Sequence, residues 1–318
     1  METTPYTEIH TPETLIGAVR FFADEDKCFE YVCAIKWPGG EVCCPECGTI
    51  SVGKIKSRRL FQCREKQCRK QFSAKVGTIF EDSPLPLSKW LVAVWCIVNA
   101  RNGVSSCELA RSLGITQKSA WHMLHRIRLA MQTPTYRKIR GEVETDESFV
   151  GGRLKFMHKH KQAKVKAEFG PKGMNKTVVQ GMFERGGELR TQVVPNSQAR
   201  FIHPGILKNV EPGSLLYSDI ATHYHGLEKY FRREVVNHLY HYAIGINHVN
   251  TLEGFWSLIK RTIRGTYVAV SPKHLDRYLD EMTRRFNLRD MPDGDRFRFV
   301  MTDILGRRLK YAELVDAQ

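Results

Sequence analysis

The sequence lacks three features that would place it in other classes of protein: a long apolar run, a secretory start and an even set of cysteines. No stretch approaches the ~18 consecutive apolar residues that a membrane-spanning helix needs. The first six residues, Met1 to Tyr6, have neither the basic start nor the apolar core of a secretion signal. Nine cysteines, an odd number, argue against a framework of disulfides. We therefore expect an intracellular globular protein with no membrane partner.

Acidic residues are also scarce relative to basic ones. The 318 residues include 49 Lys and Arg against 34 Asp and Glu, which gives a formal net charge of +15 and a pI near 9.5. Such a surface attracts phosphates at long range and indicates a nucleic-acid partner, although charge alone also fits a basic protein without one. The length is sufficient for two or three domains, one of them with a sizeable core.

Four of the cysteines form two pairs with the spacing of a zinc ribbon. The segments Cys44-Pro-Glu-Cys47-Gly and Cys63-Arg-Glu-Lys-Gln-Cys68 have fifteen residues between them, with hairpin character from 50 to 61. A tight turn places two thiolates on one side, and a second pair completes a tetrahedron around Zn²⁺. We predict that Cys44, Cys47, Cys63 and Cys68 bind a structural zinc ion. The alternative is that they are ordinary buried cysteines.

Residues 105–129 have the pattern of a helix-turn-helix. The first helix ends near Gly114, and Thr116 caps a second helix whose buried face carries Leu124 and Ile127. The N-terminal side chains of such a second helix enter the major groove of DNA. The side chains expected to contact DNA are Gln117, Lys118, His122 and Arg126, with His125 also on an outward face and Arg128 nearby. A plain pair of packed helices is the alternative.

From about residue 141 the hydrophobic period changes toward that of strands. Strands are predicted at 142–150, 177–183, 189–194, 214–218 and 234–237, and helices at 197–208, 227–231, 251–263 and 271–287. A three-stranded meander followed by alternating helices and strands is typical of a ribonuclease H-like α/β domain. We therefore predict a mixed sheet flanked by helices, preceded by the zinc ribbon and the helix-turn-helix.

A basic insertion interrupts the first two of these strands. The segment from Arg153 to Lys176 contains eight Lys and Arg and a single acid, Glu168. We expect it to contact DNA through side chains such as Lys155, Lys159 and Lys161. The alternative is a solvated loop.

Carboxylates at two strands predict a metal site. Asp146 lies in the middle of the first predicted strand of the sheet, and Asp219 ends the fourth. In a ribonuclease H-like sheet these strands are neighbours, so both carboxylates can share a divalent cation, Mg²⁺ or Mn²⁺. Glu144 and Glu147 are assigned to the opposite face of the strand from Asp146, where we expect them to be solvated or salt-bridged.

A third group must come from a helix that faces the same edge. Asn250, Glu253 and Lys260 fall close to one helical face, with Glu253 34 positions after Asp219 and Lys260 seven positions later. Lys260 and Arg261 are placed to hold a phosphate near the metals.

These residues resemble the Asp-Asp-Glu triad and trailing basic residue of DDE transposases. The longer motifs around these residues resemble the zinc-ribbon transposases of bacterial insertion sequences, over roughly residues 30–290. The matching segments are the Cys-Pro-x-Cys-Gly ribbon, Gly77-Thr-Ile-Phe80, Glu144-Thr-Asp146-Glu-Ser-Phe-Val-Gly-Gly152, His248-Val-Asn250-Thr-Leu-Glu253-Gly-Phe-Trp-Ser-Leu-Ile-Lys260-Arg261, Gly265-Thr-Tyr267, Lys273-His-Leu275 and Arg277-Tyr278. In this family the third metal-facing position can be an asparagine, which would be Asn250. We favour Glu253 as the ligand because a carboxylate neutralises metal charge better than an amide, and Asn250 as a neighbour that orients it or a water.

The resemblance implies an insertion-sequence transposase that binds element ends and catalyses metal-dependent cleavage and strand transfer of DNA. It implies double-stranded DNA of the element ends and target as partners, a homo-oligomer when assembled on DNA, and a bacterial, cytoplasmic, nucleoid-associated location. A DNA-binding regulator on an inactive scaffold, or a nuclease without joining activity, would share the same motifs. The expected domains are 1–40 (helical), 41–82 (zinc ribbon), 83–135 (helix-turn-helix), 140–290 (catalytic) and 291–318 (C-terminal tail).

Overall fold

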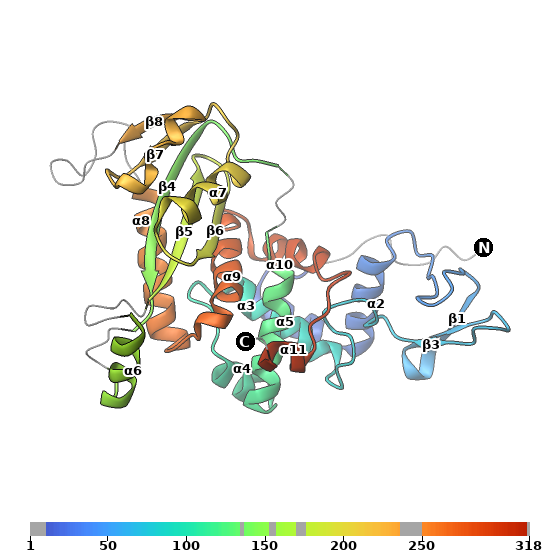
Figure 1. Cartoon of the computed structure of the whole chain (residues 1–318). Helices are drawn as coiled ribbons and strands as arrows, with labels where there is room; N and C mark the ends of the chain where they lie inside the picture. Colours follow the sequence, from blue (N-terminus) through green and yellow to red (C-terminus); the bar gives the residue numbers. More distant parts are fainter. Residues whose placement is uncertain (1–10, 134–136, 153–156, 170–175, 236–249, 317–318) are drawn as a thin grey trace. The chain divides into compact units, whose positions relative to one another are not determined.

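The computed structural model describes residues 11–133, 137–152, 157–169, 176–235 and 250–316 (Figure 1). The chain divides into two compact units, one made of Met1–Gln132 and Leu288–Gln318, the other of Thr133–Asn287. The segment 291–318, expected as a tail, thus folds with the N-terminal half. Within the described ranges, no helix has the length and apolar character that crossing a bilayer requires.

The first unit begins with two helices and a small antiparallel sheet. The elements are α1 (Leu15–Phe22), α2 (Glu25–Lys36), β1 (Val52–Ile55), β2 (Leu60–Cys63) and β3 (Gln71–Phe72). The strands pair in the order β1-β2-β3. The Phe61 ring stacks on Phe72 at 5.6 Å and on Phe29 of α2 at 5.7 Å between ring centroids, so this sheet has a small aromatic core.

Helices complete the first unit. They are α3 (Leu87–Asn99), α4 (Ser106–Leu113), α5 (Gln117–Ala130), α10 (Asp293–Thr302) and α11 (Tyr311–Asp316). The helix-turn-helix forms where the sequence predicts it. Gly114 ends α4 with a φ of 58°, and the Thr116 hydroxyl accepts the backbone N–H of Ser119 at 3.1 Å to cap α5.

The second unit is built on a five-stranded mixed sheet. Its strands are β4 (Glu142–Val150), β5 (Thr177–Glu184), β6 (Leu189–Val194), β7 (Leu215–Ser218) and β8 (Arg232–Val235). They lie in the order β6-β5-β4-β7-β8; β4, β5 and β6 form an antiparallel meander, and β7 and β8 run parallel to β4. The predicted ribonuclease H-like sheet is confirmed. The last strand begins two residues earlier than the sequence suggested.

Helices cover both faces of this sheet. Helix α7 (Ala199–Asn209) packs on one face, where Val143, Val178 and Met182 point. Helices α8 (Asn250–Thr262) and α9 (Leu275–Asn287) pack on the other, with Val179 and Phe183. Because side chains alternate along a strand, even-numbered residues of β4 face α8 and odd-numbered ones face α7.

Short helical segments connect these elements. They are α6 (Lys159–Phe169) in the basic insertion, the 3-10 turns η1 (Lys56–Arg58), η3 (Thr222–Tyr224), η4 (Leu227–Lys229) and η6 (Pro272–His274), and a π-helical turn, η5 (Ile263–Tyr267). The helix expected at 227–231 is therefore only a 3-10 turn.

Candidate functional site

Asp146 and Asp219 lie at the same edge of the sheet. Strands β4 and β7 are parallel neighbours in which Glu144 is opposite Tyr217, so two further steps along each strand lead to Asp146 and Asp219. Burial raises the pKa of Asp146 to about 6, and the nearby charges of Glu147 and Asp219 act in the same direction. Carboxylates gathered at one place are a typical environment for a bound cation, which would relieve their mutual repulsion.

An indole holds one oxygen of Asp146. The Trp256 Nε1–H on α8 donates to Oδ2 of Asp146 at 2.9 Å and opposes the rise in its pKa. The Trp256 ring lies over Gly181 of β5, the residue opposite Asp146, and a Cβ at Gly181 would come within 2.7 Å of the ring. Neither residue was assigned a role from the sequence. A glycine inside a strand signals close approach of another group and could have pointed to Gly181.

The remaining predicted catalytic residues lie on the exposed side of α8. Asn250, Glu253, Lys260 and Arg261 are exposed, whereas Leu252, Phe255 and Ile259 are buried. Within the described ranges, Asp146, Asp219 and Glu253 do not form a set whose oxygens all lie within 4.8 Å of one another. Both Asn250 and Glu253 therefore stay candidates for the third position.

The turn after β7 fixes the Asp219 backbone. Oδ1 of Asp219 accepts the backbone N–H of Ala221 at 2.9 Å. The Arg233 guanidinium donates to Oγ of Ser218 at 2.9 Å and to the carbonyl of Asp219 at 3.0 Å, and it pairs with Glu228 at 2.9 Å. Asp219 is thus held by its own loop and by β8.

The assignment of Glu144 to the face opposite Asp146 is wrong. Two residues apart on one strand, both side chains point toward α8. The prediction of salt bridges is correct, since Glu144 pairs with Arg185 at 3.2 Å and Glu147 with His223 at 2.8 Å. Neither glutamate is solvated: 0% of the Glu144 side chain and 6% of the Glu147 side chain are exposed.

The first residues of α5 are accessible to a partner, but fewer side chains of this helix are exposed than the sequence predicted. Gln117 and Lys118 are exposed. The Lys118 ammonium lies 4.5 Å from the ring centroid of Tyr311 on α11. His122 is half-buried, with Nε2 3.2 Å from the carbonyl of Leu309.

The assignment of His125 to an outward face is wrong, and Arg126, predicted to contact DNA, is buried as well. His125 is fully buried, and only 4% of Arg126 is exposed. The Arg126 guanidinium donates to the carbonyl of Glu81 and lies 5.2 Å from the Trp90 ring, and burial lowers its pKa to about 10. Helix α5 is closely covered from Met123 onward because α3 and the chain around Arg307 pack against it.

Part of the basic insertion, residues 159–169, forms helix α6. Lys159 begins α6 and is exposed. Lys155 and the side chain of Lys161 lie outside the described residues.

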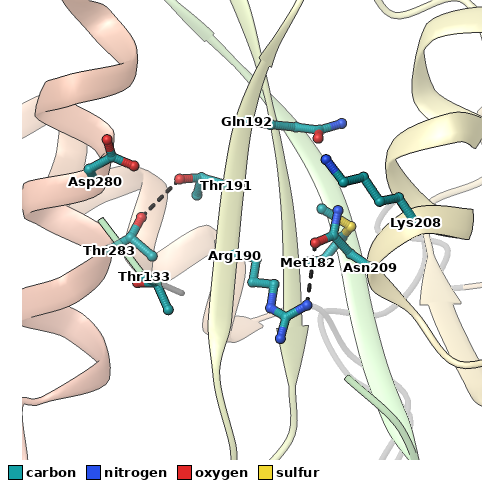
Figure 2. Close-up of a pocket in the computed structure, with 9 residues that line it drawn as sticks. All are labelled: Thr133, Met182, Arg190, Thr191, Gln192, Lys208, Asn209, Asp280 and Thr283. Carbon is teal, nitrogen blue, oxygen red and sulfur yellow. Dashed lines mark hydrogen bonds between the residues drawn. The ribbon is translucent and has the colours of Figure 1, made fainter. Parts of the chain in front are cut away.

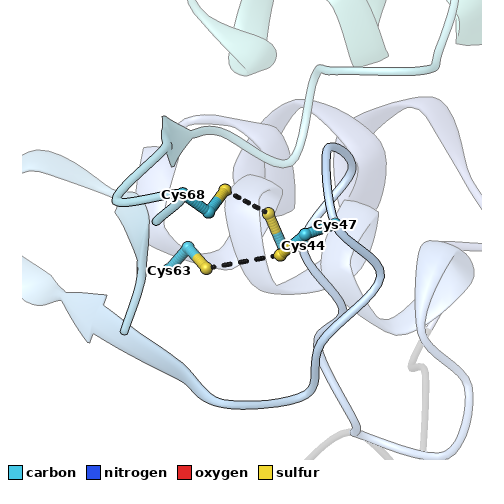
Figure 3. A group of neighbouring side chains, drawn as sticks. All are labelled: Cys44, Cys47, Cys63 and Cys68. Atoms are coloured by element: carbon cyan, nitrogen blue, oxygen red, sulfur yellow. Dashed lines mark hydrogen bonds between the residues drawn. The ribbon is translucent and has the colours of Figure 1, made fainter. Parts of the chain in front are cut away.

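The four predicted cysteines converge (Figure 3). The sulfurs of Cys44 and Cys68 lie 3.7 Å apart, those of Cys47 and Cys63 3.6 Å apart, and all four lie within 4.8 Å of one another. Four sulfurs about 2.3 Å from a zinc ion would be separated by about 3.8 Å, so the spacing fits a tetrahedral site. Backbone N–H groups of Cys47 and Glu46 lower the pKa of Cys44 to about 7, whereas burial raises the pKa of Cys63 to about 12. Zinc binding would therefore have to displace the proton of the buried Cys63 thiol.

A separate small pocket flanks the edge strand β6 (Figure 2). Its volume is about 150 Å³, and its residues are Thr133, Met182, Arg190, Thr191, Gln192, Lys208, Asn209, Asp280 and Thr283. Thr191 and Thr283 share a hydrogen bond of 2.9 Å, and Arg190 donates to Asn209 at 3.3 Å. It contains none of the predicted catalytic residues.

Comparisons with known proteins match both the zinc ribbon and the domain built on the five-stranded sheet. Residues 138–287 match the ISXO2-like transposase domain, and residues 23–71 match the transposase zinc-ribbon domain. The chain is 27% identical over 282 residues to an uncharacterized protein in transposable element ISH50 from Halobacterium salinarum, covering 85% of this chain and 92% of that protein. It is 34% identical over 98 residues to an uncharacterized transposase-like protein of Haemophilus influenzae, covering 30% of this chain and 79% of that protein.

Proposed function

This chain belongs to the IS1595 family of transposases, and we propose that it binds the ends of an insertion sequence and catalyses metal-dependent cleavage and strand transfer of DNA. The observation that carries the proposal is the placement of Asp146 and Asp219 at one edge of adjacent parallel strands. The helix that bears Glu253 is fixed to Asp146 by the Trp256 indole.

The residues at this edge suit a hard divalent cation, since they offer carboxylate oxygens. Asp146, Asp219 and Glu253 would hold Mg²⁺ or Mn²⁺. When bound, such ions activate a water or 3′-hydroxyl and stabilise the leaving oxygen of an in-line displacement at phosphorus. Cleavage and strand transfer share this geometry, so one set of carboxylates serves both.

Other side chains of α8 would position the DNA strand. Lys260 and Arg261 are exposed at the C-terminal end of the helix and would bind phosphates close to the reacting one. Asn250, in the first turn, would orient Glu253 or a water. Glu253 is the preferred third ligand, because a carboxylate balances metal charge and an amide does not.

The first unit would recognise element ends. Four cysteines in the geometry of a zinc site would stabilise the ribbon. The exposed Gln117 and Lys118 begin the second helix of the helix-turn-helix, the helix that would contact DNA bases. Lys159 and its neighbours on α6 add positive charge for DNA of the ends or the target. Because two element ends must be brought together, we expect a homo-oligomer assembled on DNA.

The proposal is tested by incubating purified protein with labelled element ends in Mg²⁺ or Mn²⁺. Wild type should nick the 3′ ends and join them to target DNA, whereas Asp219→Ala should bind the ends and do neither. Asp290→Ala is a matched control, since its side chain is 85% exposed in the first unit.

Other results would select the alternatives. A wild-type protein that binds ends without nicking them would be a regulator, and one that nicks without joining would be a nuclease. Full activity in Asp219→Ala would overturn the assignment of Asp219 to the catalytic site. Separate Glu253→Gln and Asn250→Ala variants decide the third ligand, because loss of the true ligand should abolish cleavage.

A further inference from the structure

The glutamate two residues before Asp146 contacts the start of α8. The Glu144 side chain is fully buried; Oε2 accepts the backbone N–H of Leu252 at 3.3 Å, and Oε1 accepts the Thr251 hydroxyl at 3.3 Å. The first turn of a helix has unpaired N–H groups and a partial positive charge, so a carboxylate there stabilises it. Glu144 thus caps a helix that is remote in sequence.

This contact couples the docking of α8 to β4. A buried carboxylate is costly unless it is paired, and Glu144 is balanced by Arg185 and by the N-terminus of α8. The residue that follows Leu252 is Glu253, the preferred third ligand. A shift of the first turn of α8 would therefore move that ligand. It would also leave the buried Glu144 carboxylate without the donors that α8 supplies.

The glutamate after Asp146 makes an equivalent contact on the opposite face. Glu147 Oε1 accepts the Tyr224 hydroxyl at 2.7 Å, and Oε2 lies 2.8 Å from Nε2 of His223. Both partners belong to η3, which begins three residues after Asp219. Tyr224 is fully buried, and the His223 carbonyl lies 2.8 Å from Nε2 of His203 on α7.

We propose that Glu144 and Glu147 are positioning residues of the catalytic site. Glu144 fixes the helix with the third ligand, and Glu147 fixes η3, the turn that follows Asp219, both relative to the strand with Asp146. The proposal rests on the proposed function, because it assigns roles at the same site. It explains why two glutamates flank Asp146 in a chain where acidic residues are scarce: each ties one of the other two site elements to β4.

The test compares Glu144→Gln and Glu147→Gln with Glu142→Gln. Glutamine keeps the size but presents an NH₂ group to donors that need an acceptor. Glu142 is a matched control on the same strand: it also pairs with Arg185, and among the described residues its carboxylate has no hydrogen bond to α8 or η3. The measurements are Mn²⁺ affinity by calorimetry, cleavage rate with labelled ends, and hydrogen exchange at α8 and η3.

We expect about 10- to 100-fold weaker Mn²⁺ binding and slower cleavage in both variants, the typical effect of losing a group that orients a metal ligand. Faster exchange should appear in the first turn of α8 for Glu144→Gln and in η3 for Glu147→Gln. Thr251→Val and Tyr224→Phe, which remove one donor each, should show the same pattern more weakly. They keep the test decisive if a glutamine variant fails to fold.

The outcomes separate the two proposals. An active wild type with Glu144→Gln, Glu147→Gln and the donor variants all equal to Glu142→Gln would overturn the positioning roles alone. A wild type that neither cleaves DNA nor binds Mn²⁺ would overturn the proposed function and, with it, the roles assigned here.

Discussion

At the scale of single residues, Gly181 is the position where the smallest change has the clearest consequence. A Cβ there would lie 2.7 Å from the Trp256 ring and 3.0 Å from Leu252. We expect Gly181→Ala to lower the free energy of unfolding by about 1–3 kcal/mol, because both groups are packed and buried. Chemical denaturation of the folded chain measures this change.

Gly254→Ala is the matched control for that prediction. It lies inside α8, with nothing within 4 Å of an added Cβ. Alanine should raise the free energy of unfolding by up to about 1 kcal/mol, the difference in helix propensity. Equal effects of the two substitutions would show that the Trp256 contact does not constrain β5.

His223 should make stability depend on pH. The hydrogen bond to Glu147 and the charges of Glu147 and Asp219 raise its pKa above the ordinary value. The protonated ring therefore stabilises the fold fully below pH ~6.5, and this contribution is lost as pH rises through the higher folded-state pKa. His223→Gln should lower the melting temperature more at pH 6 than at pH 9.

The contribution of Glu147 to the raised pKa of His223 can be measured separately. In an NMR titration, the pKa of His223 should fall in Glu147→Gln relative to wild type. An unchanged pKa in that variant would mean that another group controls the ring, and the attribution to Glu147 would be wrong.

At the scale of elements, the sequence predicts where α5 begins but not how much of it is exposed. Gly114 and Thr116 specify the turn and the cap by local chemistry. Burial of Arg126 depends on Glu81 and on packing by distant chain segments, which no local pattern in α5 reveals. The prediction that Arg126 contacts DNA did not include this burial for that reason.

The catalytic site, too, was predicted from the sequence in part and depends in part on tertiary packing. Strand order was enough to predict that β4 and β7 are neighbours and thus that Asp146 and Asp219 share an edge. The Trp256 contact depends on the tertiary approach of α8 to β5, which spacing does not encode. The error at Glu144 was different in kind, since the two-residue period of a strand already places it on the face of Asp146.

Helix α5 should show separate effects on binding and stability at its two ends. Lys118→Ala removes an exposed charge, so DNA affinity should fall and the slope of log affinity against log salt should decrease by about 1. Its free energy of unfolding should change by less than about 1 kcal/mol.

Arg126→Leu is the comparison within the same helix. The carbonyl of Glu81 would lose its buried donor, so the free energy of unfolding should fall by about 1–3 kcal/mol. The salt slope of the folded variant should match wild type. A reduced slope in Arg126→Leu would mean that this guanidinium reaches DNA in the complex.

At the scale of the whole molecule, the two units are stabilised in different ways. The second unit contains a five-stranded sheet with apolar clusters on both faces. The ribbon of the first unit has three short strands, and its few buried side chains, such as Phe61 and Phe72, belong to a core shared with the helices of that unit. The ribbon has no separate core of its own, so we expect its strands to depend on a cross-link. Its four convergent thiols supply that cross-link only when a metal is bound.

Removal of zinc should therefore unfold the ribbon and spare the sheet. We expect about one equivalent of zinc per chain, lost in Cys44→Ser or with a strong chelator. Hydrogen exchange should then accelerate across β1, β2 and β3 and stay unchanged across β4 and β5. Cys43→Ser is the control, because Cys43 is exposed and outside the cluster. Zinc lost equally in both variants, or faster exchange in β4 and β5, would contradict a metal that serves the ribbon alone.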